Sequence, residues 1–443
     1  QPIEVSLCCT PQPTPYTIMS ATAVSGVTRK RVRKLSKKIY LHFDLNRTVL
    51  MSDAAGGRSI EDTVNYLLAE VCYGKAQGEG WAPFSPYEPR PGANLNPDLV
   101  SYKSFGDRKF PYLNQGDASA KVPEGYESIA KYNKSQKKHR KKLQSSFTNE
   151  GSPGVSFRPY MDDVLKALSL PEDKQEAAAK ASAEVENGLL AEFWRNGKYF
   201  LLPSFLNFLV YLQSDEALME NVNIIYRTFG EDLEEVSKEL KMFQEGKHPC
   251  YPGLHLDRRL CLSEPFGVFF RNSEESDGIA LAIGTMTKAP KDCADIKAFY
   301  EELGQGNVSL AHGFAACHKA MMGRFSDTVH AAGFRDYFEW WHSHGESDDS
   351  GKVLLVNDKS SEAYQSEYHA FIDDHVEADH SHIVDVRTAG DGSVISPKES
   401  IGKVIFRAEP YVAITNDAYF IEQFEMILKT AGAEDVGDRE SNL

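Results

Sequence analysis

Short apolar segments that end abruptly in a polar residue constrain the fold of this chain more than any other feature. The run Ile39–Phe43 is followed at once by Asp44, and the run Val222–Tyr226 is followed by Arg227 and Thr228. Such runs are typical of strands that are buried on both faces of a parallel sheet. We therefore expect the polar residues to lie where these strands end.

Helical patterns alternate with the apolar runs. Ser59 and Asp62 have the spacing of a capping box, and apolar residues recur at helical intervals after them. Further buried strands are predicted at Val353–Val356 and at Tyr368–Ile372, which the acidic pair Asp373–Asp374 follows. This alternation predicts an α/β fold with a Rossmann-like parallel sheet sandwiched by helices.

Composition limits the class of protein. With 443 residues, of which 41% are hydrophobic, the chain can bury a substantial core. The longest apolar stretch, around Phe205–Leu212, is shorter than the roughly 18 to 20 residues of a membrane span. The seven cysteines show no C-x-x-C spacing, so neither a zinc knuckle nor a disulfide framework is indicated. We expect a cytoplasmic protein with reduced thiols.

The net charge of the chain limits the kinds of partner that it can bind. A formal net charge of −15 argues against a general nucleic-acid binder, because affinity for polyanions depends on Lys and Arg. Two basic segments, Arg29–Lys38 and Lys131–Lys142, stand out against this background. The second is expected to be a solvated helix face; the alternatives are a rim that attracts an anionic substrate and a nucleic-acid contact through both segments.

The histidines do not predict a zinc site. None forms a helical H-x-x-x-H pair with a partner acid in a recognisable ligand pattern. The residues considered are His312, His318, His342, His344, His375, His380 and His382.

The predicted domain organisation is a core interrupted by two insertions. The expected core consists of residues 35–55, 195–245 and 310–430. Residues 56–194 would form a large cap insertion, irregular from 74 to 159, and residues 246–309 a smaller insertion with a β-hairpin. Residues 1–34 are expected to be a flexible basic arm and residues 431–443 a disordered acidic tail.

Four segments in this order carry a family resemblance. Phe43–Val49 reads Phe-Asp-Leu-Asn-Arg-Thr-Val, and Ile224–Thr228 ends a strand in Thr. Lys352 precedes the strand Val353–Val356, and Ala370–Asp374 ends in an acidic pair. Together they resemble the motifs of the haloacid dehalogenase superfamily of phosphatases and phosphotransferases, over roughly half of the chain.

The resemblance implies a magnesium-dependent aspartyl nucleophile. A carboxylate can attack phosphorus only where a metal and fixed cations offset the repulsion between two anions. Asp44 would be this nucleophile, on a phosphorylated small molecule or a phosphoprotein. Mg²⁺ would be held by Asp44, by Asp373 or Asp374, and by the backbone carbonyl of Asn46.

Two further residues would bind the phosphoryl group. Thr228 would donate a hydrogen bond to a phosphoryl oxygen, and Lys352 would place a positive charge beside it while restraining Asp44. Lys319 and Lys359 are alternatives for the lysine.

Asn46 departs from the motif of the family. The family has an Asp at this position, which resembles a general acid that protonates the leaving oxygen and then activates water. An amide cannot exchange that proton. The sequence therefore predicts a weak or specialised phosphatase or phosphotransferase; the alternative is a catalytically inactive protein of the same fold that acts as a binding or scaffold module.

Overall fold

The computed structural model describes residues 34–51, 59–91, 98–113, 121–271, 278–290, 293, 295–303, 307–377 and 383–432. Several predictions lie outside these ranges: most of the basic arm before residue 34, nearly all of the acidic tail, and His380 and His382.

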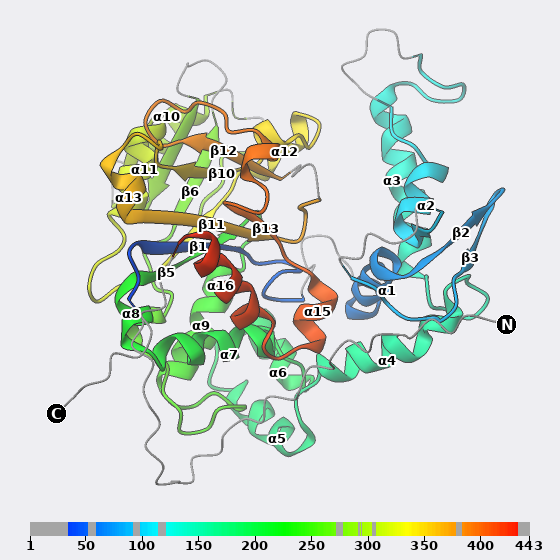
Figure 1. The fold of residues 1–443 in the computed structure, drawn as a ribbon, viewed down its shortest axis with the longest axis horizontal. Helices are drawn as coiled ribbons and strands as arrows, with labels where there is room; N and C mark the ends of the chain where they lie inside the picture. Colours follow the sequence, from blue (N-terminus) through cyan, green and yellow to red (C-terminus); the bar gives the residue numbers. More distant parts are fainter. Residues whose placement is uncertain are drawn as a thin grey trace, which may run out of the picture.

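An eight-stranded sheet forms the centre of the larger part of the molecule (Figure 1). The six strands from β13 to β6 run parallel, and β7 and β8 are antiparallel to their neighbours. In spatial order the strands are β13 (Ile405–Arg407), β11 (Glu367–Asp373), β1 (Lys38–Asp44), β5 (Val222–Thr228), β9 (Ala331–Arg335), β6 (Gly267–Arg271), β7 (Ile279–Ile283) and β8 (Ser309–His312). The predicted α/β class, with a mostly parallel sheet between helices, is confirmed.

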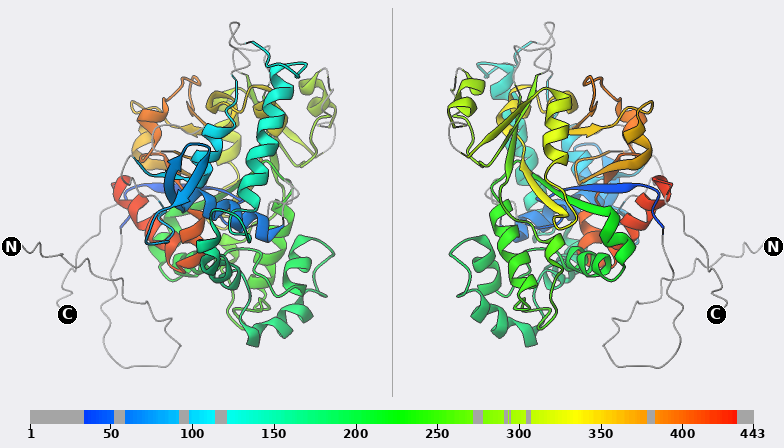
Figure 2. Two further views of the ribbon diagram at one scale, coloured as in Figure 1. Left: turned by 90° about the vertical axis from the view of Figure 1, so that its right-hand side faces the viewer. Right: turned by 90° about the vertical axis from the view of Figure 1, so that its left-hand side faces the viewer.

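Two layers cover the sheet, as Figures 1 and 2 show. On one face of β1, Phe43 packs against the aromatic rings of Phe205 in α7 (Pro203–Gln213) and Phe420 in α16 (Tyr419–Thr430). On the other face, Tyr40 packs against Phe325, which follows α11 (Phe314–Met322). Side chains alternate along a strand, so residues 39, 41 and 43 enter one core and residues 40, 42 and 44 face the other layer.

The helices are mostly short. Those of the first half are α1 (Ile60–Val71), α2 (Tyr102–Lys109), α3 (Ile129–Ser145), α4 (Arg158–Ala167), α5 (Glu172–Ala181), α6 (Leu189–Arg195), α7 (Pro203–Gln213) and α8 (Glu216–Asn221). Those of the second half are α9 (Leu233–Gln244), α10 (Ile296–Leu303), α11 (Phe314–Met322), α12 (Phe338–Ser343), α13 (Glu362–Ser366), α14 (Pro397–Ser400), α15 (Pro410–Thr415) and α16 (Tyr419–Thr430).

The expectation of irregular structure from 74 to 159 is wrong. This region contains α2, α3 and a small antiparallel sheet of β2 (Tyr73–Gln77), β3 (Gly80–Pro83) and β4 (Val100–Ser101), beside α1 and apart from the large sheet (Figure 1). Helix α3 carries the basic segment 131–142 and buries only Gln136 and Gln144. Apolar periodicity could not reveal a helix that buries so little apolar surface.

Strand prediction succeeded where the apolar run is long. Strands β1, β5 and β11 and the hairpin of β6 and β7 are confirmed. Strand β9 was missed, because its sequence Ala-Ala-Gly-Phe-Arg contains only one large apolar side chain. The segment predicted at 353–356 is a strand, β10 (Lys352–Val356), but it pairs in a separate two-stranded sheet with β12 (Val384–Thr388). Within the described residues, no helix combines the length and apolar character needed to cross a membrane.

Candidate functional site

The strand order reverses direction at β1. From β1 the chain continues through β5 and later β9 on one side, and then returns to add β11 and β13 on the other side. In open α/β sheets such a switch point leaves a crevice beyond the carboxyl ends of the strands. Asp44, Thr228 and Asp373 end β1, β5 and β11 respectively, so all three lie at this edge.

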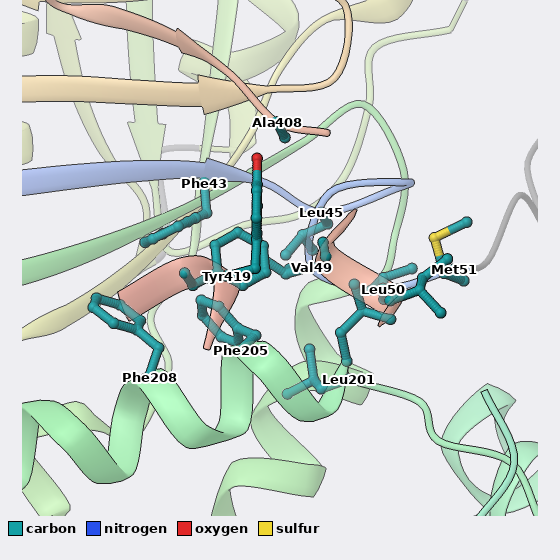
Figure 3. Close-up of a cluster of buried hydrophobic side chains, with 14 of the residues drawn as sticks. Phe43, Leu45, Val49, Leu50, Met51, Leu201, Phe205, Phe208, Ala408 and Tyr419 are labelled. Atoms are coloured by element: carbon teal, nitrogen blue, oxygen red, sulfur yellow. The ribbon is translucent and has the colours of Figure 1, made fainter. Parts of the chain in front are cut away.

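The packing beneath β1 fixes the direction of Asp44. Phe43 and Leu45 enter the apolar cluster formed with Phe205 and Phe208 of α7 (Figure 3). The side chain between them therefore points to the opposite face. There Asp44 is only 5% exposed, and its Oδ2 accepts a hydrogen bond of 3.3 Å from Thr48 Oγ1.

Lys352 connects two of the strand ends. Its Nζ donates hydrogen bonds to Asp44 Oδ1 at 2.5 Å and to Asp373 Oδ2 at 2.9 Å, and the lysine is 1% exposed. Burial works to lower the pKa of Lys352, but the two carboxylates outweigh burial and raise it. The lysine is therefore a fixed positive charge. The alternatives Lys319 and Lys359 are exposed.

Ionising Asp44 is costly in spite of Lys352. Burial and the neighbouring Asp373 and Asp374 raise the pKa of Asp44 from 3.8 to about 7, although Lys352 acts in the opposite direction. For Asp373, burial is outweighed by Lys352 and His375, which hold its pKa below the usual range. Burial is thus the main cost of ionising Asp44, and a further cation beside it would lower that cost.

Asp374 contacts two cations. Its Oδ1 lies 2.8 Å from His375 Nδ1, and its Oδ2 lies 3.2 Å from Arg47 Nη1. Burial opposes protonation of His375, but Asp374 outweighs it and raises the pKa of His375 to about 10. Arg47 also contacts Glu70 of α1 at 3.1 Å and lies over the ring of Tyr66. Through these contacts α1 reaches the edge of the site.

The side chain of Asn46 contacts a carboxylate and a hydroxyl group. Its Nδ2 donates a hydrogen bond of 2.9 Å to Asp232 Oδ2 and lies 3.5 Å from Thr228 Oγ1. Asp232 is the N-cap residue of α9, yet its side chain makes no capping hydrogen bond to that helix. It instead accepts from Asn46 and, at 3.4 Å, from Thr228. A carboxylate is thus present beside the residue that lacks one.

The site residues suit a hard divalent cation. Asp374 Oδ2 is buried, and its ion pair with Arg47 at 3.2 Å lacks the geometry of a hydrogen bond. Burial and the neighbouring acids raise the pKa of Asp44, so a cation beside it would favour its ionised form. Oxygen ligands of this kind, few in number, are what Mg²⁺ prefers. Asp44 and Asp374 could hold the ion, whereas both oxygens of Asp373 already accept hydrogen bonds, from Lys352 and from the backbone N–H of His375. The expected contribution of the Asn46 carbonyl stays a prediction.

We expect stabilisation by Mg²⁺ to depend on pH. In the metal-free protein, ionising Asp44 costs stability as pH rises through about 7, because its pKa in the folded state lies above the unfolded value. Mg²⁺ requires the ionised form, so its apparent affinity should fall about tenfold per pH unit below 7 and level off above it. Thermal melting with and without Mg²⁺ at pH 5.5 and pH 8 measures this. An equal shift at both pH values, or an unchanged shift in Asp44→Asn, would exclude Asp44 as a ligand.

Sequence reasoning missed Arg47, Asp232 and His375 as members of the site. Arg47 has a positive φ of 65°, an uncommon backbone conformation for a residue with a side chain, in the turn after β1. Such strain gathers at functional sites, but a sequence does not display it. Asp232 follows a predicted strand by four residues, and only that position could have drawn attention to it.

Comparison of this chain with known proteins found no match. No family model matches the sequence, and the searches of curated proteins and of solved structures also give no match.

Proposed function

We propose that this protein is a magnesium-dependent phosphatase or phosphotransferase of the haloacid dehalogenase type, with Asp44 as its nucleophile. The observation that supports this most directly is the bridge from Lys352 to Asp44 and Asp373, at 2.5 and 2.9 Å. A buried lysine between two strand-end carboxylates holds the nucleophile in place and offers positive charge to an incoming phosphoryl group.

The first step is an attack on phosphorus. An Asp44 oxygen forms the new bond to phosphorus while the bond to the leaving oxygen breaks, and the phosphoryl group is carried as an aspartyl phosphate. Thr228 donates a hydrogen bond to a phosphoryl oxygen, and Lys352 offsets its charge. Mg²⁺, when bound, would further offset the charge of the phosphoryl group.

Because Asn46 cannot donate a proton to the leaving oxygen, we assign this role to Asp232. Asp232 protonates the leaving oxygen and, as a carboxylate, then takes a proton from the water that attacks the aspartyl phosphate. Phosphate leaves, and the carboxylate of Asp44 is regenerated. The contact of 2.9 Å between Asp232 and Asn46 supports this role, because it places a carboxylate next to the residue that the family motif would have as Asp.

Turnover tests the proposal. The full-length protein should release phosphate from a panel of phosphorylated small molecules and phosphopeptides with Mg²⁺, and should lose this activity in EDTA. Phosphate release that persists in EDTA would contradict a magnesium-dependent site. Inactivity of the protein on the whole panel, with Mg²⁺ bound, would favour the scaffold alternative.

A further inference from the structure

A second cluster of ligand-type side chains lies at the opposite end of β11. His318 of α11 and Glu367 and His369 of β11 each offer one ligand atom, and these atoms lie within 4.8 Å of one another. His369 and Asp373 are four positions apart in the sequence, which corresponds to about 13 Å along a strand. The cluster is therefore distinct from the site at Asp44.

Two nitrogens in this cluster have no partner. His318 Nε2 and His369 Nε2 are both buried, and no described residue forms a hydrogen bond with either of them. His369 is only 2% exposed, and its ring stacks on Tyr40 with the centroids 4.8 Å apart. A buried ring nitrogen without a partner costs free energy unless a ligand satisfies it. Two such nitrogens in one cluster point to a shared ligand.

We propose that His318, Glu367 and His369 form a binding site for a transition-metal ion, Zn²⁺ in the first place. Two imidazoles and one carboxylate are a ligand set that zinc uses where a fourth position stays open to water or substrate. Bonds of about 2.0 to 2.2 Å in a tetrahedral site place neighbouring donors about 3.4 Å apart. Since the three donor atoms all lie within 4.8 Å of one another, the side chains need to approach by little more than about 1 Å at most.

Both imidazoles are neutral at neutral pH. Burial lowers the pKa of His318 to about 4, and burial together with His318 lowers the pKa of His369 to about 3. The neutral form is the one that binds metals. Glu367 is held in place by Asn357, whose Nδ2 donates a hydrogen bond of 2.7 Å to Glu367 Oε2.

A chain of contacts from Arg227 through His42 determines which ring nitrogen of His369 carries the proton. Arg227 Nη1, which can only donate, lies 3.3 Å from His42 Nδ1, and His42 Nε2 lies 3.3 Å from His369 Nδ1. Without metal, His42 therefore donates to His369 Nδ1, and the His369 proton is on Nε2. That proton is the buried donor that has no acceptor.

Metal binding reverses this chain. The ion displaces the Nε2 proton of His369, and His369 then donates from Nδ1 to His42 Nε2, as metal-bound histidines commonly donate to a second group. His42 takes up one proton at Nδ1, so the net release of protons is zero. Arg227 loses its contact with His42 but keeps Asp336 and the carbonyl of Val353 as acceptors. This loss makes the site weaker than a preformed zinc site.

Calorimetric titration with Zn²⁺ tests the site. Because the cluster of Asp373, Asp374 and His375 can also attract zinc, the titration is made on protein carrying Asp374→Asn and freed of metal by a chelator. We expect one Zn²⁺ per chain and a higher melting temperature. In that background, His318→Ala and Glu367→Gln should each weaken binding at least 10-fold, and the exposed His312→Ala should not. Absence of binding in the background protein, or equal affinity in all variants, would overturn the proposal.

Discussion

Replacing Asp44 with Asn is expected to lower phosphoryl transfer at least ~10³-fold, because the amide cannot form the aspartyl phosphate. The residual rate should not respond to Mg²⁺, since one of the proposed ligands is also removed. The measurement is steady-state phosphate release by matched preparations of both proteins, on the best substrate of the panel.

The fold of this variant should survive. Asn is close in shape to Asp, and Lys352 keeps Asp373 as its partner. Because burial and neighbouring acids make ionised Asp44 costly, the melting temperature at pH 8 without Mg²⁺ should not fall. Asp327→Asn, a change at an exposed position, is the matched control. Full activity in Asp44→Asn would assign the chemistry to another site or to a contaminant.

Asp232→Asn is expected to slow hydrolysis of an alkyl phosphate by roughly 10² to 10⁴-fold, the usual contribution of a general acid and base. The loss should be smaller with para-nitrophenyl phosphate, whose leaving oxygen needs less protonation. If both substrates keep the wild-type kcat, Asp232 does not act as the acid and base.

Asn46→Asp completes a double-mutant cycle with Asp232→Asn. The sequence alone predicts that this near-isosteric change restores activity. The structure places Asp232 Oδ2 2.9 Å from the amide nitrogen, so the single variant brings two carboxylates together and should raise the pKa of one of them. In the double variant, Asn at position 232 can donate to Asp at position 46, so a hydrogen bond between the two positions is kept. We therefore expect it to recover much of the rate that Asp232→Asn loses.

Failure of the double variant has a definite meaning. If Asp232→Asn is slow and the double variant is equally slow, a carboxylate at position 46 cannot reach the leaving oxygen. In that case the departure at Asn46 reflects the geometry of this site, and the proton is delivered from position 232 and not from position 46.

The sequence by itself determined the class of the fold and three ends of its strands. A strand buried on both faces must be a continuous apolar run, so β1, β5 and β11 are visible locally, as are Asp44, Thr228 and Asp373 at their ends. Strand β9 was not visible in this way, because Ala331, Ala332 and Gly333 carry little apolar surface of their own.

Only the tertiary structure decided which side chains meet. The contact of Lys352 with Asp44 joins residues 308 positions apart, and that of Asn46 with Asp232 joins residues 186 positions apart. His318 of α11 meets His369 of β11, with the ring centroids 5.5 Å apart. Periodicity reports which face of an element is buried, and it carries no record of which other element covers that face. Pairing between distant segments is set by packing of the whole chain, and the chemistry of both proposed sites depends on that pairing.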